Sequence, residues 1–199
     1  MATRYLETHF TPAVLDAQRR HQGRTYPIPV NAPEDPLTEE EAAFIAERDS
    51  FYVATVNHDG WPYMQHRGGA PGFLKVLAPN LLAFPDYGGN RQMLSVGNLA
   101  ENDRTALFLM DYPNQTRLKI IGHTTVLDPR EHPELVALWT RSPSGPRIER
   151  IFQIRVISFD WNCPKFITPR YTAAEIEKAV APLHRRIAEL EAALNRPQT

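Results

Sequence analysis

The sequence predicts a mainly β fold: a closed or nearly closed antiparallel barrel with helices around it. From residue 51 to about residue 127, short β-like runs alternate with turn residues at the regular spacing of hairpins. Eighteen prolines interrupt the chain where a strand or a helix would end. With 42% hydrophobic and 23% charged residues, a chain of this length can bury one sizeable core. We therefore expect a single domain, residues 1–199, with helical additions.

Residues 1–37 are expected to form an N-terminal helix and arm. The segment PAVLDAQRRHQ, residues 12–22, is predicted to be a short helix, and the proline-rich stretch after it is predicted to be extended. Another helix is expected to begin after Thr38, whose side chain can cap it together with Glu41. The arm therefore leads into a helix that precedes the first strand.

Residues 38–170 are expected to hold the barrel and its helices. The predicted strands are residues 51–57, 61–67, 73–77, 81–85, 105–111 and 117–127, with a helix at 91–99. Asp59 and Gly60 favour a tight turn between the first two strands. Beyond these elements, PREHPELVALWTR is predicted to be a helix and RIERIFQIRVISFDW another strand.

Residues 171–199 are predicted to contain an amphipathic helix. Thr172 can cap it with Glu175 three residues later, and Pro182 is expected to kink it. Its apolar residues follow a spacing of three and four: Ile176, Val180, Leu183, Ile187, Leu190 and Leu194. Such a stripe must be covered, either by the chain's own barrel or by a second subunit.

The composition excludes several classes of protein. A formal charge of −1 gives no overall field that would attract nucleic acid or an anionic membrane. Cys163 is the only cysteine, which excludes an intramolecular disulfide and a multi-cysteine zinc site. The seven histidines lack paired metal-ligand spacing, and no segment has the pattern of a signal peptide or a membrane span. We expect a soluble cytoplasmic protein without a metal site.

Four stretches place cationic or amide side chains inside the predicted strands or at their ends. They are QHRGG (65–69), YGGNRQM (87–93), RLKIIG (117–122) and WNCPKF (161–166). Taken singly, each has an ordinary explanation, such as the solvated face of a sheet, a simple turn or a core tryptophan. Their conjunction favours a ligand site.

The second stretch has the features of an anion site. Gly88 and Gly89 allow backbone conformations closed to other residues, and Arg91 lies at the predicted helix start. Free N–H groups at a helix N-terminus bind anions, and an arginine can add a two-pronged contact to a phosphate. In the third stretch, alternation along the strand projects Arg117 and Lys119 from one face.

The first stretch is expected to end as the wall of the ligand site. The period of two gives two sets of side chains, with Tyr63, Gln65 and Arg67 on one side and Met64 and His66 on the other. Gly68 and Gly69 leave room for a flat ligand. A single bulge would reverse the alternation, so which of Gln65, His66 and Arg67 faces the ligand stays open.

In their order, these pieces resemble the FMN-binding split-barrel family, that of pyridoxamine 5′-phosphate oxidase and its relatives. FYVATVNHDGWPYMQHRGG, LLAFPDYGGNRQMLSVGNLAENDRTALFLMD and RLKIIGHTTV carry the resemblance, which covers about residues 38–170. It implies a six-stranded antiparallel split β-barrel of Greek-key type that binds FMN. Because members of the family are homodimers with FMN at the subunit interface, it also implies a homodimer.

The resemblance assigns cofactor-binding roles to residues of all four stretches. The implied residues are Gln65, His66, Arg67 and Gly68 on the second strand, Asn90, Arg91 and Gln92 in the phosphate loop, Arg117 and Lys119 before the IG pair, and Trp161 and Lys165 near the C-terminus. The last two would reach the flavin of the partner subunit. Cations near the flavin N1 and C2 carbonyl would stabilise the anion that forms on reduction.

Two departures separate this chain from the true oxidases. Gln92 stands where those enzymes commonly have a second basic residue, and WNCPKFITPR replaces their Arg-x-His substrate element. That stretch is similar to a predicted flavin-nucleotide-binding branch in which Asn-Cys-Pro-Lys recurs. The resemblance thus implies an FMN-dependent oxidoreductase acting on a small organic substrate, with NADH or NADPH as candidate electron donor, rather than a true pyridoxamine phosphate oxidase.

Two alternatives stay open. The protein could store or sense FMN without turnover, or the same fold could bind haem or the deazaflavin F420. Haem would need an axial histidine, for which His66 and His123 are the candidates, and F420 would need more cationic surface. The sequence indicates neither the substrate nor the catalytic residues.

Overall fold

The computed structural model describes residues 2–89, 91–140, 145–161 and 164–195. Its helices are α1 (Thr3–His9), α2 (Pro12–Gln22), α3 (Glu39–Ala46), α4 (Leu94–Glu101), α5 (Pro133–Val136) and α6 (Ala173–Leu194). Its strands are β1 (Ser50–Val56), β2 (Pro62–Gly68), β3 (Lys75–Ala78), β4 (Leu81–Tyr87), β5 (Arg104–Asp111), β6 (Thr116–Leu127) and β7 (Ile148–Trp161).

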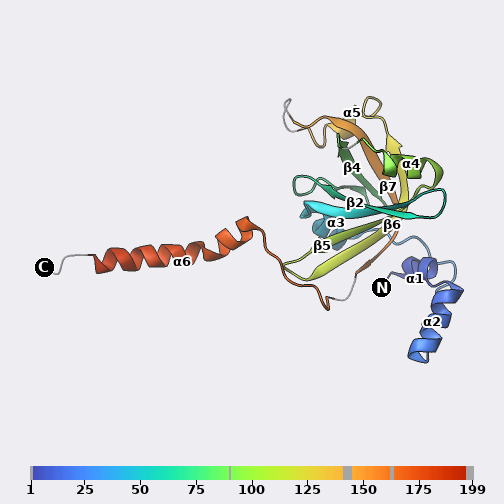
Figure 1. The fold of residues 1–199 in the computed structure, drawn as a ribbon, viewed down its shortest axis with the longest axis horizontal. Helices are drawn as coiled ribbons and strands as arrows, with labels where there is room; N and C mark the ends of the chain where they lie inside the picture. The colour runs from blue at the N-terminus through green and yellow to red at the C-terminus, as the bar shows by residue number, and fades with distance from the viewer. Residues whose placement is uncertain (1, 90, 141–144, 162–163, 196–199) are drawn as a thin grey trace.

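The strands form one antiparallel sheet in the order β2-β1-β5-β6-β7-β4-β3 (Figure 1). This confirms a mainly antiparallel β fold with helices around it. The six-stranded count is not confirmed, because β7 makes a seventh strand that pairs with β6 on one side and β4 on the other. The described sheet is also not closed: β2 and β3 remain its two edges.

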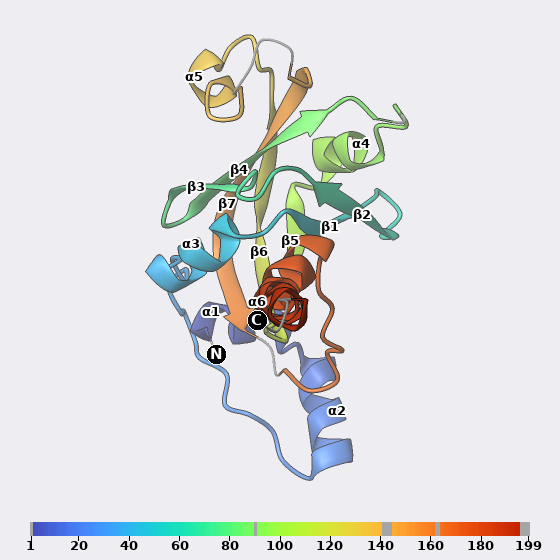
Figure 2. The same cartoon turned by 90° about the vertical axis from the view of Figure 1, so that its left-hand side faces the viewer.

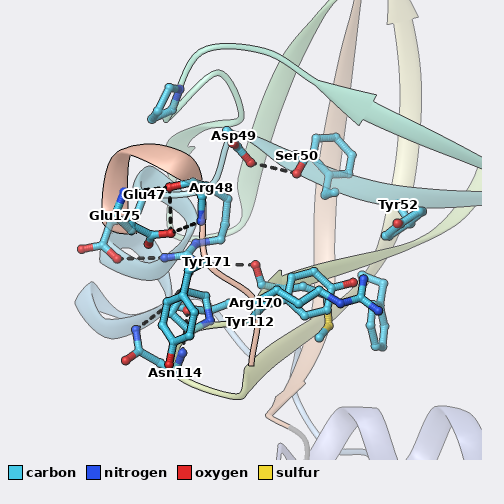
Figure 3. Close-up of a pocket in the computed structure, with 17 residues that line it drawn as sticks. Glu47, Arg48, Asp49, Ser50, Tyr52, Tyr112, Asn114, Arg170, Tyr171 and Glu175 are labelled. Atoms are coloured by element: carbon cyan, nitrogen blue, oxygen red, sulfur yellow. Dashed lines mark hydrogen bonds and ion pairs between the residues drawn. The ribbon is translucent and has the colours of Figure 1, made fainter. Parts of the chain in front are cut away.

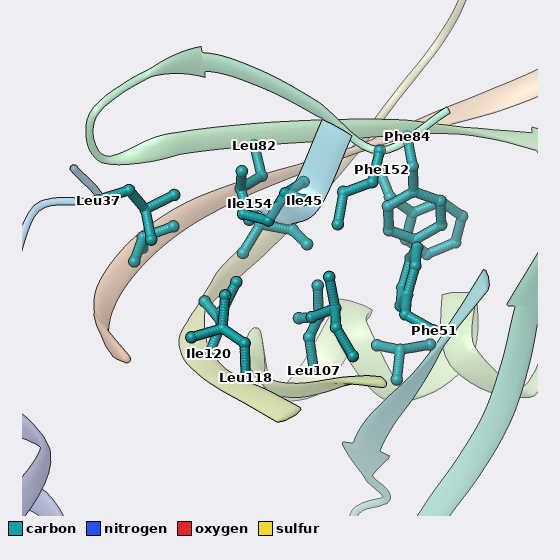
Figure 4. Packing of buried hydrophobic residues seen from close by; sticks show 14 of the residues in the cluster. Leu37, Ile45, Phe51, Leu82, Phe84, Leu107, Leu118, Ile120, Phe152 and Ile154 are labelled. Carbon is teal, nitrogen blue, oxygen red and sulfur yellow. The ribbon is translucent and has the colours of Figure 1, made fainter. Parts of the chain in front are cut away.

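The core lies on the concave side of this curved sheet. Side chains of β4 and β7, such as Phe84 and Ile154, face those of β5 and β6, such as Leu107 and Ile120, and all four are at most 1% exposed (Figure 4). Strand β1 alternates buried and more exposed residues, as a strand with one face on the core must. The helix α3 closes one end of the core with Ile45, which is fully buried.

Two neighbouring carboxylates attach the N-terminal arm to β7: Glu34, which pairs with Arg155 at 2.5 Å, and Asp35. Asp35 accepts hydrogen bonds from the Arg4 backbone N–H (3.0 Å) and the Ser158 hydroxyl (2.5 Å), and its own N–H donates to the Ile157 carbonyl (3.0 Å). The predicted helix at 12–22 is present as α2, whereas α1 was not predicted. The capping box of Thr38 and Glu41 is present at the start of α3.

Helix α6 begins with the predicted capping box of Thr172 and Glu175 and contains Pro182. It projects away from the sheet, so the view of Figure 2 looks almost along it. None of its residues is buried. The chain's own sheet therefore does not cover the apolar stripe. In the described part of the chain, none of the helices has the length and apolar character needed to cross a bilayer.

Candidate functional site

A small pocket lies between β2, the end of β4 and the start of α4. Fourteen residues line it: Tyr63, Gln65, Arg67, Asp86, Tyr87, Gly89, Arg91, Gln92, Met93, Leu94, Ser95, Val96, Glu149 and Arg150. The side chains of β2 alternate as the period of two predicts, so Gln65 and Arg67 face the pocket. His66 is exposed on the opposite face, where its ring meets that of Tyr52 edge-on at 5.5 Å.

Arg67 is held by a carboxylate that the sequence did not reveal. Its Nη1 lies 2.5 Å from Asp86 Oδ1, and its guanidinium stacks 5.1 Å from the ring centre of Phe152. Asp86, only 6% exposed, also accepts from Arg150 Nε at 2.7 Å, because the two residues are paired across β4 and β7. The Arg67 Nε is buried and has no hydrogen-bond partner among the described residues.

The loop before α4 has unusual backbone geometry. Arg91 and Met93 have left-handed φ angles of 60° and 57°, which side-chain-bearing residues seldom adopt. Met93 is the N-cap of α4, and its own side chain makes no cap hydrogen bond to the first N–H groups of the helix. This geometry explains why α4 begins at Leu94 and not at residue 91 as predicted. Asn90 lies outside the described residues.

Two of the pocket's cations neutralise carboxylates, and the third does not. Arg67 and Arg150 both contact Asp86, and Arg150 also contacts Glu149 at 2.9 Å. Arg91 is exposed and forms no ion pair with any residue that the structure describes. The lining therefore carries three cations and two carboxylates, and Arg91 supplies the excess positive charge.

A side-chain hydrogen bond joins β2 to α4, and a neutral hydrogen-bond donor, the Tyr87 phenol, also lines the pocket. The Ser95 hydroxyl donates to Gln65 Oε1 at 3.1 Å. Burial raises the pKa of the Tyr87 phenol, which therefore stays protonated and can donate a hydrogen bond. The sequence analysis did not assign Tyr87, Ser95, Asp86 or Arg150 to the site. Tyr87 lies in the YGGNRQM stretch, but the Asp86–Arg150 pair depends on β4 pairing with a strand far along the chain.

Gly68, also a predicted site residue, ends β2 and does not line this pocket. Arg117, Lys119 and Trp161 lie at the other end of β6 and β7. Arg117 and Lys119 share a face, as predicted, and the buried Arg117 Nε has no hydrogen-bond partner among the described residues. Lys119 Nζ lies 2.8 Å from Asp160 Oδ2. Burial lowers the pKa of Lys119, but the hydrogen bond to Asp160 and the nearby Tyr5 more than offset this, so its pKa lies above the usual value and it stays charged.

Trp161 is packed into its own chain. Its Nε1 donates to Glu41 Oε1 at 2.6 Å, and its ring meets Phe44 edge-on at 4.9 Å. Lys165 is exposed in the turn that follows β7, and the neighbouring Asn162 and Cys163 lie outside the described residues.

The two groups of predicted residues are too far apart to share one ligand within a chain. At roughly 3.3 Å per residue, the part of β7 from Arg150 to Trp161 is on the order of 35 Å long. Gln65, Arg67, Arg91 and Gln92 are brought together at one end of it. Arg117 and Trp161 lie near the other end.

A second, larger pocket of about 490 Å³ lies where α6 leaves the sheet (Figure 3). Arg48 Nη1 lies 3.0 Å from Asp111 Oδ2, and the Arg170 guanidinium stacks on the neutral ring of Tyr112 at 4.9 Å. Burial raises the pKa of Asp111, but hydrogen bonds from Asn114 and the charge of Arg48 hold it below its usual value. The Arg170–Tyr112 contact joins the segment before α6 to the turn between β5 and β6.

Comparison with known proteins identifies the family. Residues 37–158 match the family model described as pyridoxamine 5′-phosphate oxidase. The chain belongs to this family. No curated protein matches the sequence. The β2–α4 pocket therefore lies within the part of the chain that defines a member of the pyridoxamine 5′-phosphate oxidase family.

Solved structures are similar to this family member at low sequence identity. HupZ from Group A Streptococcus is 13% identical, with a TM-score of 0.51 over 69% of this chain and 99% of that one. A putative pyridoxamine 5′-phosphate oxidase from Lactobacillus delbrueckii is 20% identical, with a TM-score of 0.49 over 63% and 94%. An FMN-binding protein from Syntrophomonas wolfei is 10% identical, with a TM-score of 0.48 over 62% and 85%.

Proposed function

We propose that this protein binds FMN in the β2–α4 pocket and is an oxidoreductase acting on a small organic substrate. The observation that carries the proposal is the start of α4, where the side chain of the N-cap residue Met93 makes no cap hydrogen bond, beside Arg91, which has no ion-pair partner among the described residues. Membership of the pyridoxamine 5′-phosphate oxidase family supports it. The chain lacks the Arg-x-His substrate element, so we propose that pyridoxamine phosphate is not its substrate.

The phosphate of FMN fits the start of α4. A phosphomonoester carries about −1.5 to −2 charges at neutral pH, and the N–H groups and dipole at a helix N-terminus attract such a group. Arg91 adds a full positive charge at the same place. The left-handed Arg91 and Met93 also support a role for this loop, because strained backbone of this kind concentrates at ligand sites.

The flavin ring would extend from the phosphate along β2. The side chains of Gln65 and Tyr87 offer hydrogen bonds there. One chain cannot enclose the ring, because this pocket holds about 60 Å³ and ligand pockets usually measure roughly 300–1,000 Å³. We therefore propose a homodimer in which Arg117, Trp161 and Lys165 of the second copy complete the site, since within one chain they lie too far away to do so.

The bound flavin would supply the redox chemistry. The residues of the pocket would bind and orient it, and a cation near the ring would favour electron uptake. The pocket's two carboxylates are ion-paired with arginines, so neither is available as a general base. This suits a protein whose own side chains need only position the cofactor and substrate.

The test is the flavin content of the purified protein and of two arginine variants. We expect absorption maxima at roughly 370 and 450 nm, typical of flavins. Arg91→Ala should weaken FMN binding by about 1.5–3 kcal/mol, the value of a hydrogen bond to a charged group. Arg20→Ala, which removes an exposed arginine from α2, is the matched control and should bind FMN as the unaltered protein does.

Equal flavin content in Arg91→Ala and the control after dialysis would refute the phosphate assignment. A Soret band in place of flavin absorption would support haem instead. Stopped-flow mixing with NADH or NADPH then tests the oxidoreductase assignment. A bound flavin that neither donor reduces, and that candidate acceptors do not reoxidise, would favour storage or sensing.

A further inference from the structure

Helix α6 carries a row of apolar side chains that the described chain does not cover. Five of them are between 48% and 84% exposed: Ile176, Leu183, Ile187, Leu190 and Leu194. Val180, the sixth, is half-buried. Because most of the stability of helices in proteins comes from packing of an apolar face, a continuous apolar row along α6 indicates contact with another surface.

The row has the spacing of a coiled-coil seam. Its members are alternately four and three residues apart from Ile176 to Leu194, which is the average of 3.5 that two supercoiled helices share. In heptad notation the a positions are Val180, Ile187 and Leu194, and the d positions are Ile176, Leu183 and Leu190. β-Branched residues at a with leucine at d favour a two-stranded parallel coil, and both central heptad pairs follow this rule. Pro182 falls at a c position, so its ring lies outside the seam, but a proline inside a helix removes one backbone hydrogen bond and bends the helix, and the part of the seam beyond it runs from Leu183 to Leu194.

The charges beside the seam also favour a parallel pair. Arg186 occupies a g position and Glu191 the e position five residues later, so each Arg186 would face Glu191 of the other copy. In an antiparallel pair, e positions face e positions, and Glu177 would oppose Glu191. Within its own helix Arg186 contacts Glu189 at 2.9 Å, but both side chains are about two-thirds exposed, so water screens this pair strongly.

We propose that α6 forms a parallel two-stranded coiled coil with α6 of a second copy of this chain. The capping box of Thr172 and Glu175 fixes where the helix begins, and Arg170, two residues before Thr172, stacks on Tyr112 in the turn between β5 and β6. The coil is a contact separate from the β2–α4 pocket, and it does not depend on flavin binding.

Disulfide cross-linking of the full-length chain tests the proposal. A Cys163→Ser background removes the only native cysteine. In it, Leu190→Cys places a thiol at a d position, where the two copies of a parallel coil face each other closely enough for a disulfide. Ala192→Cys, at an f position on the outer side of the helix, is the matched control. Under mild oxidation we expect a covalent dimer from the Leu190→Cys protein and a monomer from the control.

Failure of the Leu190→Cys protein to cross-link, or equal cross-linking of both proteins, would overturn the proposal. The Leu190→Cys protein would fail to cross-link if the helices formed an antiparallel pair, or if each helix lay on the sheet of another copy. Charge reversal tests the register in the same background. Arg186→Glu should lower the yield of covalent dimer, and adding Glu191→Arg should restore it, with circular dichroism confirming that each variant is folded. A yield that the second change does not restore would refute the parallel pairing.

Discussion

Glu41 is a buried carboxylate, and hydrogen bonds from two separate segments of the chain stabilise its charge. Its Oε2 accepts from the Thr38 N–H at 2.8 Å, and its Oε1 accepts from Trp161 Nε1 at 2.6 Å. Burial raises the pKa of Glu41, but these hydrogen bonds outweigh it and hold the pKa below its usual value of 4.5. The ionised carboxylate thus contributes stability that is fully present above about pH 4.5 and is lost as the pH falls through the lowered pKa.

Trp161→Phe should therefore destabilise the protein most at neutral pH. Losing a hydrogen bond to a charged group costs about 1.5–3 kcal/mol, and this cost falls to about 0.5–1.5 kcal/mol once Glu41 is protonated, because a neutral carboxyl oxygen still accepts the bond more weakly. Urea unfolding at pH 7 and pH 3 measures the difference from the unaltered protein, which should shrink at the lower pH. Trp139→Phe is the control, because Trp139 donates to the Phe73 carbonyl, a group that does not titrate. An equal loss at both pH values for Trp161→Phe would contradict this account.

Single residues of the pocket differ in how well the sequence revealed them. Gln65 and Arg67 could be assigned to one face, because alternation along a strand needs only local information. Asp86 could not be recognised as the partner of Arg67, because they meet only when two distant segments fold together. Trp161 was expected at the flavin of a partner. Its indole N–H donates to Glu41 of its own chain, so only the remaining surface of the ring is available to contact a flavin.

Among the elements, the features that depend on local sequence were predicted correctly, whereas those that depend on the pairing of distant segments were not. The β1–β2 hairpin was predicted from Asp59 and Gly60, and Gly60 has the positive φ, 84°, that such a turn requires. The count of six strands, which the resemblance implied, is not confirmed: the sequence also predicted the strand that is β7, but its pairing with both β4 and β6 spans long stretches of sequence. Helix α1 was not predicted, since its attachment depends on Asp35 and β7.

The β6–β7 pairing depends on a glycine at a bulge. The register shifts between Ile121 and Gly122, and a Cβ on Gly122 would lie 2.4 Å from the Arg155 carbonyl oxygen. Because that neighbour is backbone, Gly122→Ala should cost about 1–3 kcal/mol, as overpacking does. Gly97→Ala, in α4 with open space around it, should instead stabilise by about 0.5–1 kcal/mol. Thermal unfolding of both variants checks this, and equal melting temperatures would refute the steric argument.

At the scale of the whole molecule, the predicted site residues occupy two ends of an elongated sheet. If a homodimer places the Arg91 end of one copy against the Arg117 end of its partner, two variants that are each defective should complement each other. Arg91→Ala and Arg117→Ala should each lose flavin. After the two are unfolded and refolded together, about a quarter of the sites should again have both arginines, given random pairing into dimers.

Flavin content of the mixed sample measures complementation. Each variant refolded alone provides the control, and differently tagged chains show that mixed dimers have formed. Mixed dimers that recover no flavin would mean that the two arginines do not meet across an interface.

The direction of α6 restricts how two copies can be arranged. In Figure 1 the helix runs horizontally, whereas the body extends vertically from α5 to α2. The twofold axis of a parallel coil coincides with the coil, so a half-turn about α6 would invert the second body relative to the first. The Trp161 end of one copy would then lie on the side of the assembly that bears α4 of the other. The orientation of α6, rather than its length, would decide which surfaces of the two copies meet.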